Sequence, residues 1–135
     1  MKIETYTYDA ESPESVETFE LLKSWSPRTF PPPHLLPKLG VIVRDEGEAV
    51  AFVCADMSNS IPRAYIDFLQ TNPNAGAITR FKAVKLAEKF LCQELKRLGY
   101  GVIVGMTQKA GIACLSQRLG YWLNPKGMTY LAKTI

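Results

Sequence analysis

A strand, a turn, a long helix and a second strand follow one another over residues 63–107, and this run constrains the fold most. Residues 63–71 alternate polar and apolar side chains, and residues 80–98 place apolar side chains at helical spacing. Gly99 is typical of a helix C-terminus, and the apolar residues 102–107 indicate a strand covered on both faces. Such a unit places its two strands parallel in one sheet.

The N-terminal half of the chain predicts antiparallel strands and one helix. Residues 39–46 and 48–57 flank a turn at Asp45–Gly47 and therefore predict a hairpin. Residues 26–38 contain five prolines, which exclude a regular helix or a central strand. Ser12 and Pro13 are typical of a helix start.

Three further elements complete the expected fold. We expect strands over residues 2–9 and 128–135, and a short helix over residues 110–122 that stops at Gly120. The chain is therefore expected to form a single domain over residues 1–135. Its class is α+β, a mixed and mostly antiparallel sheet with helices on both faces.

The helix over residues 80–98 carries its charges in an uneven way. Its lysines fall opposite the apolar face, which consists of Val84, Ala87, Leu91, Leu95 and Leu98. Arg80 instead falls on the apolar side of the first turn, where a cation is disfavoured by about 0.3–1 kcal/mol. An arginine that faces inward at this position needs a carboxylate, a carbonyl or a ligand anion. A structural partner and a ligand both remain open.

Composition disfavours several classes of function. A net charge of +3 is too small to indicate nucleic-acid binding, and no aromatic platform lies among the lysines of the helix. One histidine and three scattered cysteines do not make a metal site. No apolar run approaches the roughly 20 residues of a membrane span, and the N-terminus does not resemble a signal peptide. We therefore expect no metal, no membrane contact and a cytoplasmic location.

Two stretches resemble the GNAT superfamily of N-acetyltransferases. Residues 67–100 resemble the strand, pyrophosphate loop and long helix of that family, with Leu69, Thr71 and Pro73 in matching positions. Residues 107–123 resemble its next helix, with RLGYW in place of Lys-Leu-Gly-Phe. The resemblance covers roughly residues 39–135 and implies the GNAT fold and an acyl-CoA cofactor.

The loop that would bind the pyrophosphate departs from the family pattern. Gly76 takes the place of the family's arginine, and Thr79 and Phe81 take the places of its last two glycines. Those glycines let the backbone approach a pyrophosphate, and a phenylalanine there adds bulk. Thr79 could cap the helix, and Arg80 could supply the missing charge. The resemblance implies a cofactor-binding set of Leu69, Thr71, Gly76, Ala77, Thr79, Arg80, Phe81 and Lys109.

The catalytic positions also depart from the family pattern. The family often uses a carboxylate on the strand before the loop as general base, and Asp67 lies on that strand. Strict alternation would place Asp67 on the same face as Tyr65, Leu69 and Thr71. In the family's next helix a tyrosine often acts as general acid, and Ser116 stands at that position here. Lys109 stands where an asparagine commonly precedes the same helix. Asp67 could equally be a structural acid.

Two functional hypotheses follow. In the first, the protein is an acetyl-CoA-dependent N-acyltransferase that acts on an unidentified amine. In the second, it is a non-catalytic binding or assembly protein with the GNAT fold that has lost acetyl-CoA binding, like some small GNAT-like proteins of bacteriophages. A sheet edge at either terminus could pair with a second copy of the chain, so a homodimer is also a hypothesis.

Overall fold

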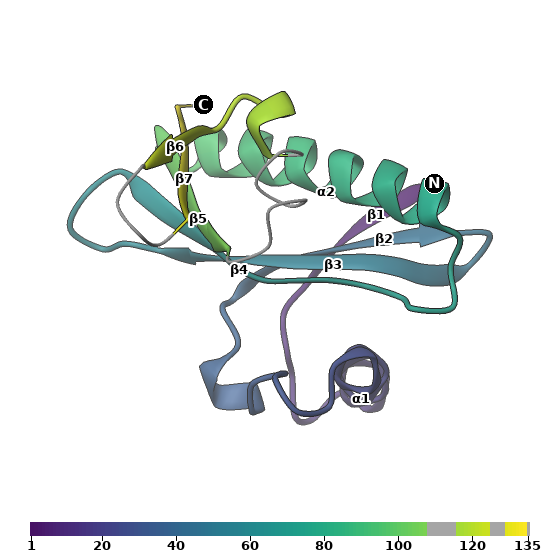
Figure 1. Cartoon of the computed structure of the whole chain (residues 1–135). Coiled ribbons are helices and arrows are strands. Elements are labelled where there is room, and N and C mark those ends of the chain that lie inside the picture. Colours follow the sequence, from purple (N-terminus) through teal and green to yellow (C-terminus); the bar gives the residue numbers. More distant parts are fainter. Residues whose placement is uncertain (108–115, 125–128, 135) are drawn as a thin grey trace.

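The computed structural model describes residues 1–107, 116–124 and 129–134, and their strands form one seven-stranded sheet (Figure 1). The strand order is β1-β2-β3-β4-β5-β7-β6. The strands are β1 (Lys2–Tyr6), β2 (Leu39–Asp45), β3 (Glu48–Met57), β4 (Arg63–Thr71), β5 (Val102–Thr107), β6 (Trp122–Asn124) and β7 (Thr129–Thr134). The helices are α1 (Pro13–Trp25), the 3-10 turn η1 (Pro33–Leu35) and α2 (Ala77–Arg97).

The sheet is mixed and mostly antiparallel, as predicted. Among the described strands, only β4 and β5 pair in parallel, and they are the two strands that α2 connects. The other described neighbours, from β1–β2 to β6–β7, pair antiparallel. No helix in the described part of the chain is long and apolar enough to cross a membrane.

Helices cover both faces of the sheet, as Figure 1 shows. On one face, α2 packs Ala83, Ala87, Leu91 and Leu95 against residues of β2, β3 and β4. On the other face, α1 and the proline-rich segment contribute Phe19, Leu22 and Phe30 to a second cluster around Ile42 and Phe52. The predicted apolar face of α2 is correct at Ala87, Leu91 and Leu95, but Leu98 lies beyond the helix end and is 46% exposed.

The β2–β3 hairpin forms at the predicted turn. Glu46 and Gly47 have φ of 50° and 86°, and Asp45 pairs with Glu48 across them. Two consecutive positive φ values are what a two-residue type I′ turn requires, and glycine meets this requirement without strain. The hairpin therefore sets the pairing next to the turn, and a bulge between Val43 and Arg44 shifts the register by one residue for the rest of the two strands.

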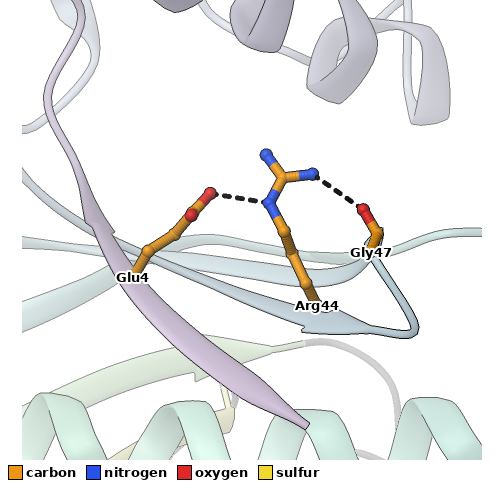
Figure 2. A network of polar contacts seen from close by, with 3 residues as sticks. All are labelled: Glu4, Arg44 and Gly47. Atoms are coloured by element: carbon orange, nitrogen blue, oxygen red, sulfur yellow. Dashed lines mark hydrogen bonds and ion pairs between the residues drawn. The ribbon is translucent and has the colours of Figure 1, made fainter.

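Strand β1 is held against β2 by close packing and by an ion pair. A Cβ at Gly40 would lie 2.6 Å from the backbone oxygen of Tyr6, so only glycine allows this approach. Arg44 Nε donates to Glu4 Oε1 at 2.8 Å, and Arg44 Nη1 donates to the Gly47 carbonyl (Figure 2). Glu4 and Arg44 are diagonal neighbours on the α1 face of the sheet.

The C-terminal part of the chain was predicted less well. Residues 110–115 of the expected helix lie outside the described residues, and residues 116–118 are helical. The expected helix extended to residue 122, but Trp122 instead begins β6, which pairs with β7. Gly120, with φ of 94°, ends the helical segment as predicted. The closing strand β7 matches its prediction.

Candidate functional site

Strands β4 and β5 separate part of the way along their length. Their parallel ladder has three pairs, Arg63↔Val102, Ala64↔Ile103 and Tyr65↔Val104. Beyond these pairs, β4 continues to Thr71 beside β3, whereas the end of β5 pairs with β7. Within the described residues, the edge of β4 from Ile66 to Thr71 therefore has no partner in β5. This free edge leads toward the start of α2.

A β-bulge lies where the strands separate. Phe52 pairs with Gln70 and Cys54 pairs with Asp67, so β4 has one more residue than β3 in this interval. Phe68 adopts φ of 49°, the left-handed region that a phenylalanine rarely occupies. Bulges bend and twist a strand and re-aim its side chains, which accounts for the change of direction of β4.

The bulge overturns the predicted alternation of β4. Residues opposite each other in a ladder share a face, and Asp67 lies opposite Cys54, which belongs to the α1-side cluster. Thr71 lies opposite Ala51, which belongs to the α2-side cluster. Asp67 and Thr71 therefore do not share a face, because the extra residue shifts the alternation by one.

Among the residues predicted from the sequence, Asp67 has the position that best suits a general base. Its side chain is half-buried at the bulge, on the α1 face of the sheet. Burial raises the pKa of Asp67, and the nearby charge of Asp56 raises it further, whereas the Phe68 backbone N–H opposes the rise by hydrogen bonding. A carboxylate with a raised pKa accepts a proton more readily than one in water.

Cys54 lies beside Asp67 but has a structural role. Its Sγ donates to the Asp67 backbone oxygen at 3.1 Å, and the residue is fully buried. Burial raises the pKa of the Cys54 thiol strongly, and the charges of Asp67 and Asp56 add to the effect. The thiol is therefore protonated at neutral pH and is a poor nucleophile.

The start of α2 lacks the usual stabilising features. Gly76 is the N-cap, and no side chain caps the helix, so the expectation that Thr79 would do so is wrong. Thr79 lies inside the first turn instead, because the first helical bond runs from Arg80 N–H to the Gly76 oxygen at 2.9 Å. The N–H groups of Ala77, Ile78 and Thr79 thus have no acceptor within the helix, and the first turn contains no acidic residue.

Arg80 turns inward, as its position in the helix predicts. The residue is half-buried, and its Nε atom is buried without a hydrogen-bond partner among the described residues. A buried donor that lacks a partner costs about 1–3 kcal/mol. The structural partner that the sequence left open for Nε is therefore not found within the described part of the chain.

Apolar side chains near the start of α2 are exposed. Phe81 is 45% exposed and Ile78 is 72% exposed, and Leu69 on β4 is 39% exposed. Phe81 is thus not packed into the core. It follows Arg80 on the helix, and the two side chains have different environments.

Two other predicted residues are placed less fully. Ser116 begins the helical residues 116–118, is half-buried, and accepts backbone hydrogen bonds from Leu119 and Tyr121 through its carbonyl. Lys109 lies outside the described residues. The roles given to Ser116 and Lys109 stay predictions.

The structure contains a buried polar cluster that was not predicted from the sequence. Tyr121 donates from its hydroxyl to Glu88 Oε1 at 3.4 Å, and Cys92 Sγ donates to the same oxygen at 3.1 Å. Burial, followed by the charge of Glu88, raises the pKa of Tyr121. Since Tyr121 is only 6% exposed, this cluster joins the segment before β6 to α2. The position of Glu88 one turn before Cys92 on α2 was its only sequence signal.

The described residues offer no group of three or more histidine, cysteine, aspartate or glutamate side chains that could hold a metal ion. The donors at the start of α2 suit a different ligand. Free backbone N–H groups, an arginine with an unsatisfied Nε and an absence of acids fit an anion such as a phosphate.

Several solved acetyltransferase structures are similar to this chain over nearly its whole length. Aminoglycoside 6′-acetyltransferase type Ii superposes with a TM-score of 0.77 at 18% identity, covering 99% of this chain and 97% of that one. An aminoglycoside 6′-N-acetyltransferase complexed with coenzyme A gives 0.73 at 17% identity, with 99% and 97% coverage. The ribosomal-protein-S18-alanine N-acetyltransferase of Escherichia coli gives 0.70 at 12% identity, with 99% and 94% coverage.

These similarities define the fold. The chain has the GNAT fold of the acyl-CoA N-acyltransferases, as its sequence predicts. No protein-family model and no curated protein sequence matches the chain.

Proposed function

We propose that this protein is an N-acyltransferase that moves an acyl group from a pantetheine thioester, such as acetyl-CoA, to an amine. The observation that carries the proposal is the separation of β4 and β5 after three ladder pairs. Within the described residues, it leaves an edge of β4 whose backbone groups have no partner in β5, and this edge leads to a helix start whose N–H groups suit an anion. A pantetheine arm contains two amide groups, which suit hydrogen bonding to such an edge.

The residues at the start of α2 provide the contacts for the phosphates. Gly76, Ala77 and Thr79 offer backbone N–H groups, and Arg80 offers a guanidinium with an unsatisfied Nε. Arg80 thereby takes over the charge that the resemblance assigns to the position of Gly76. Leu69 and Thr71 lie on the free edge of β4, along which the arm would extend.

Asp67 would accept the proton of the attacking amine. The nitrogen lone pair attacks the thioester carbonyl, the carbon–sulfur bond breaks, and the amide nitrogen loses its proton to Asp67 directly or through water. The strand N–H groups near the bulge would stabilise the oxyanion. A thiol has a pKa of about 8.5, so its anion leaves readily and Ser116 needs to contribute little as an acid.

The first experiment measures unfolding with and without acetyl-CoA. At a concentration of about one hundred times its dissociation constant, the ligand should add about 2.7 kcal/mol to the free energy of unfolding. Phe81→Gly should increase this effect if the phenylalanine hinders the approach of the pyrophosphate. A screen of amines for release of free thiol then identifies the acceptor.

S-acetyl-pantetheine is the matched control ligand, because it retains the arm and lacks the nucleotide. If neither thioester stabilises the wild type or Phe81→Gly, and no amine releases thiol, the proposal is wrong. The non-catalytic hypothesis would then account for the protein better.

A further inference from the structure

One exposed surface of α2 has a composition that the proposed reaction does not explain. We define the α2 stripe as Ile78, Phe81, Lys82, Lys85 and Lys89, all of which are exposed. Their spacing of three and four residues places them side by side on one face of the helix. Ile78 is 72% exposed and Phe81 is 45% exposed, and the three lysines follow them along the helix.

The charge of the α2 stripe is not neutralised within its own helix. The acidic residues of α2 are Glu88 and Glu94. Glu88 is buried beside Tyr121, and Glu94 pairs with Arg97 at 2.9 Å. The stripe therefore presents two apolar side chains and three positive charges, which complement an acidic surface with an apolar centre.

The α2 stripe is longer than a nucleotide would require. Lys89 follows Ile78 by eleven positions, which corresponds to about 16 Å at a rise of about 1.5 Å per residue. Arg80 and the N–H groups of the first turn suffice for a phosphate. Exposed apolar and basic side chains that span about three turns of the helix favour a macromolecular partner.

The stripe also begins where the free edge of β4 ends. From Ile66 to Thr71 that edge spans about 16 Å at roughly 3.3 Å per residue. An extended phosphopantetheine arm is of similar length. A protein that docks on the stripe could therefore lay such an arm along β4 and deliver a thioester to Asp67 at the bulge.

We propose that the α2 stripe docks an acidic carrier protein whose phosphopantetheine arm bears the acyl thioester. This inference rests on the proposed acyl transfer and names the donor. The carrier's acidic residues would face Lys82, Lys85 and Lys89, and an apolar side chain would cover Ile78 and Phe81. In the reaction, a carbon–nitrogen bond to the amine forms and the carbon–sulfur bond to the arm breaks. The amine proton leaves through Asp67, and the carrier retains a free thiol.

The test compares four probes by their affinity for the protein. They are an acetylated bacterial acyl carrier protein, the same carrier protein without its arm, S-acetyl-pantetheine and acetyl-CoA. We expect the acetylated carrier to bind at least tenfold more tightly than S-acetyl-pantetheine and to weaken as salt increases. The carrier without its arm should bind more weakly than the acetylated carrier, because only the stripe remains to hold it.

Variants on one helix separate docking from recognition of the arm. Lys85→Glu and Ile78→Ser should each weaken the acetylated carrier at least tenfold and leave the affinity for S-acetyl-pantetheine unchanged. Lys96→Glu and Leu98→Ser are matched controls near the other end of α2, where Leu98 is 46% exposed. Neither control should change the affinity for the carrier.

The outcomes distinguish the two proposals. If S-acetyl-pantetheine and acetyl-CoA bind but the carrier binds no more tightly, or the stripe variants change nothing, carrier docking is wrong and the acyl-transfer proposal survives. If no thioester binds, both are wrong. Self-association that Ile78→Ser abolishes, or tighter binding to anionic lipid vesicles than to the carrier, would also overturn the inference.

Discussion

The unit formed by β4, α2 and β5 has a closed end, where β4 pairs with β5, and an open end, where the two strands are apart and α2 begins. The two ends differ in how their charged groups are arranged. At the closed end, β4 pairs with β5, and Tyr100 donates to the Ser58 carbonyl at 2.9 Å. Gly99, with φ of 94°, ends α2, and the Tyr100 N–H bonds to the Leu95 oxygen. The last turn contains basic residues, as the helix dipole favours, and Arg97 pairs with Glu94.

At the open end these features are absent or reversed. Within the described residues, β4 has no partner in β5 beyond Tyr65, and α2 has no side-chain cap. A buried arginine Nε without an acceptor occurs at both ends, at Arg80 and at Arg63. Cations also stand where the helix dipole disfavours them. Proteins depart from such local rules mostly at functional sites. This difference supports the proposal that the open end binds a ligand, whereas the closed end contributes to stability.

The largest effect is expected for a core residue near the closed end, and an exposed residue of the open end serves as its comparison. Leu95→Ala should lower the free energy of unfolding by about 2–5 kcal/mol, because Leu95 is fully buried. Ile78→Ala should change it by no more than about 0.5 kcal/mol, because Ile78 is 72% exposed. Urea denaturation measures both. A loss above 1 kcal/mol for Ile78→Ala, on the scale of exposed substitutions, would break the comparison.

The second largest effect is expected at Asp67, which lies where β4 and β5 separate. Asp67→Asn should lower kcat about 100-fold or more, because the amide cannot accept the proton. Activity of the wild type should fall at acidic pH, and the midpoint should lie above the ordinary carboxyl value of 3.8 because burial raises the pKa. Thiol release across pH measures this. A structural role for Asp67 would leave kcat of the soluble variant unchanged.

The same residue gives a stability test with a defined sign. Well below pH 3.8 the carboxyl is protonated in both the folded and the unfolded state, so ionisation has no effect on stability. Above that pH the unfolded state releases its proton first, which lowers the stability of the folded wild type. The free energy of unfolding of the wild type, minus that of Asp67→Asn, should therefore decrease as pH rises through this window. An increase would show that the pKa is lowered.

The sequence predicted the regular parts of this fold and missed its irregular part. Residues 48–57, 63–71 and 102–107 have the predicted strand boundaries, because hydrophobic period and turn residues both mark them. The bulge at Phe68 was missed, and with it the faces of Asp67 and Thr71. In the sequence, Ala64, Ile66 and Phe68 stand at alternate positions, as apolar residues do on one face of a regular strand without a bulge. Phe68 reaches the other face only because tertiary packing brings its ring 6.4 Å from that of Phe30.

The candidate site was also predicted only in part, because some of its features depend on tertiary packing. The inward turn of Arg80 follows from helical geometry alone, and the structure confirms it. The exposure of Phe81 depends on how α2 rotates over the sheet, and the separation of β4 from β5 depends on long-range pairing. Neither depends on a local pattern. Thr79 was wrongly placed as a cap because α2 begins three residues earlier than its apolar period.

Substitution of one arginine at each end should have a smaller effect on binding or stability. Arg80→Ala should weaken acetyl-CoA binding by about 1.5–3 kcal/mol, the range of a hydrogen bond to a charged group. It should not destabilise the ligand-free protein, because it removes a buried donor that has no partner among the described residues. Arg63 is the closed-end control, because its guanidinium lies 5.2 Å from the Tyr65 ring centroid. Arg63→Ala should cost about 0.5–1 kcal/mol of stability and leave binding unchanged. Calorimetry and denaturation separate the two. The reverse pattern would make Arg80 structural.

The smallest effect comes from giving the open end the cap it lacks. Gly76 has φ of −62° and ψ of 149°, which any residue can adopt, and a Cβ there would meet only Thr79 Oγ1, at 3.9 Å. Gly76→Asp should therefore raise the free energy of unfolding by about 0.3–1 kcal/mol through the cap and the helix dipole. It should also weaken acetyl-CoA binding, because the carboxylate would compete for the N–H groups that a phosphate needs.

Gly99→Ala is the matched change at the closed end, and its effect should have the opposite sign. With φ of 94°, an alanine there is strained, so stability should fall by about 1 kcal/mol while acetyl-CoA binding stays the same. Thermal denaturation and binding of both variants test whether stability and ligand affinity trade against each other only at the open end. If Gly76→Asp stabilises the fold and leaves binding intact, the free N–H groups of α2 do not hold the ligand.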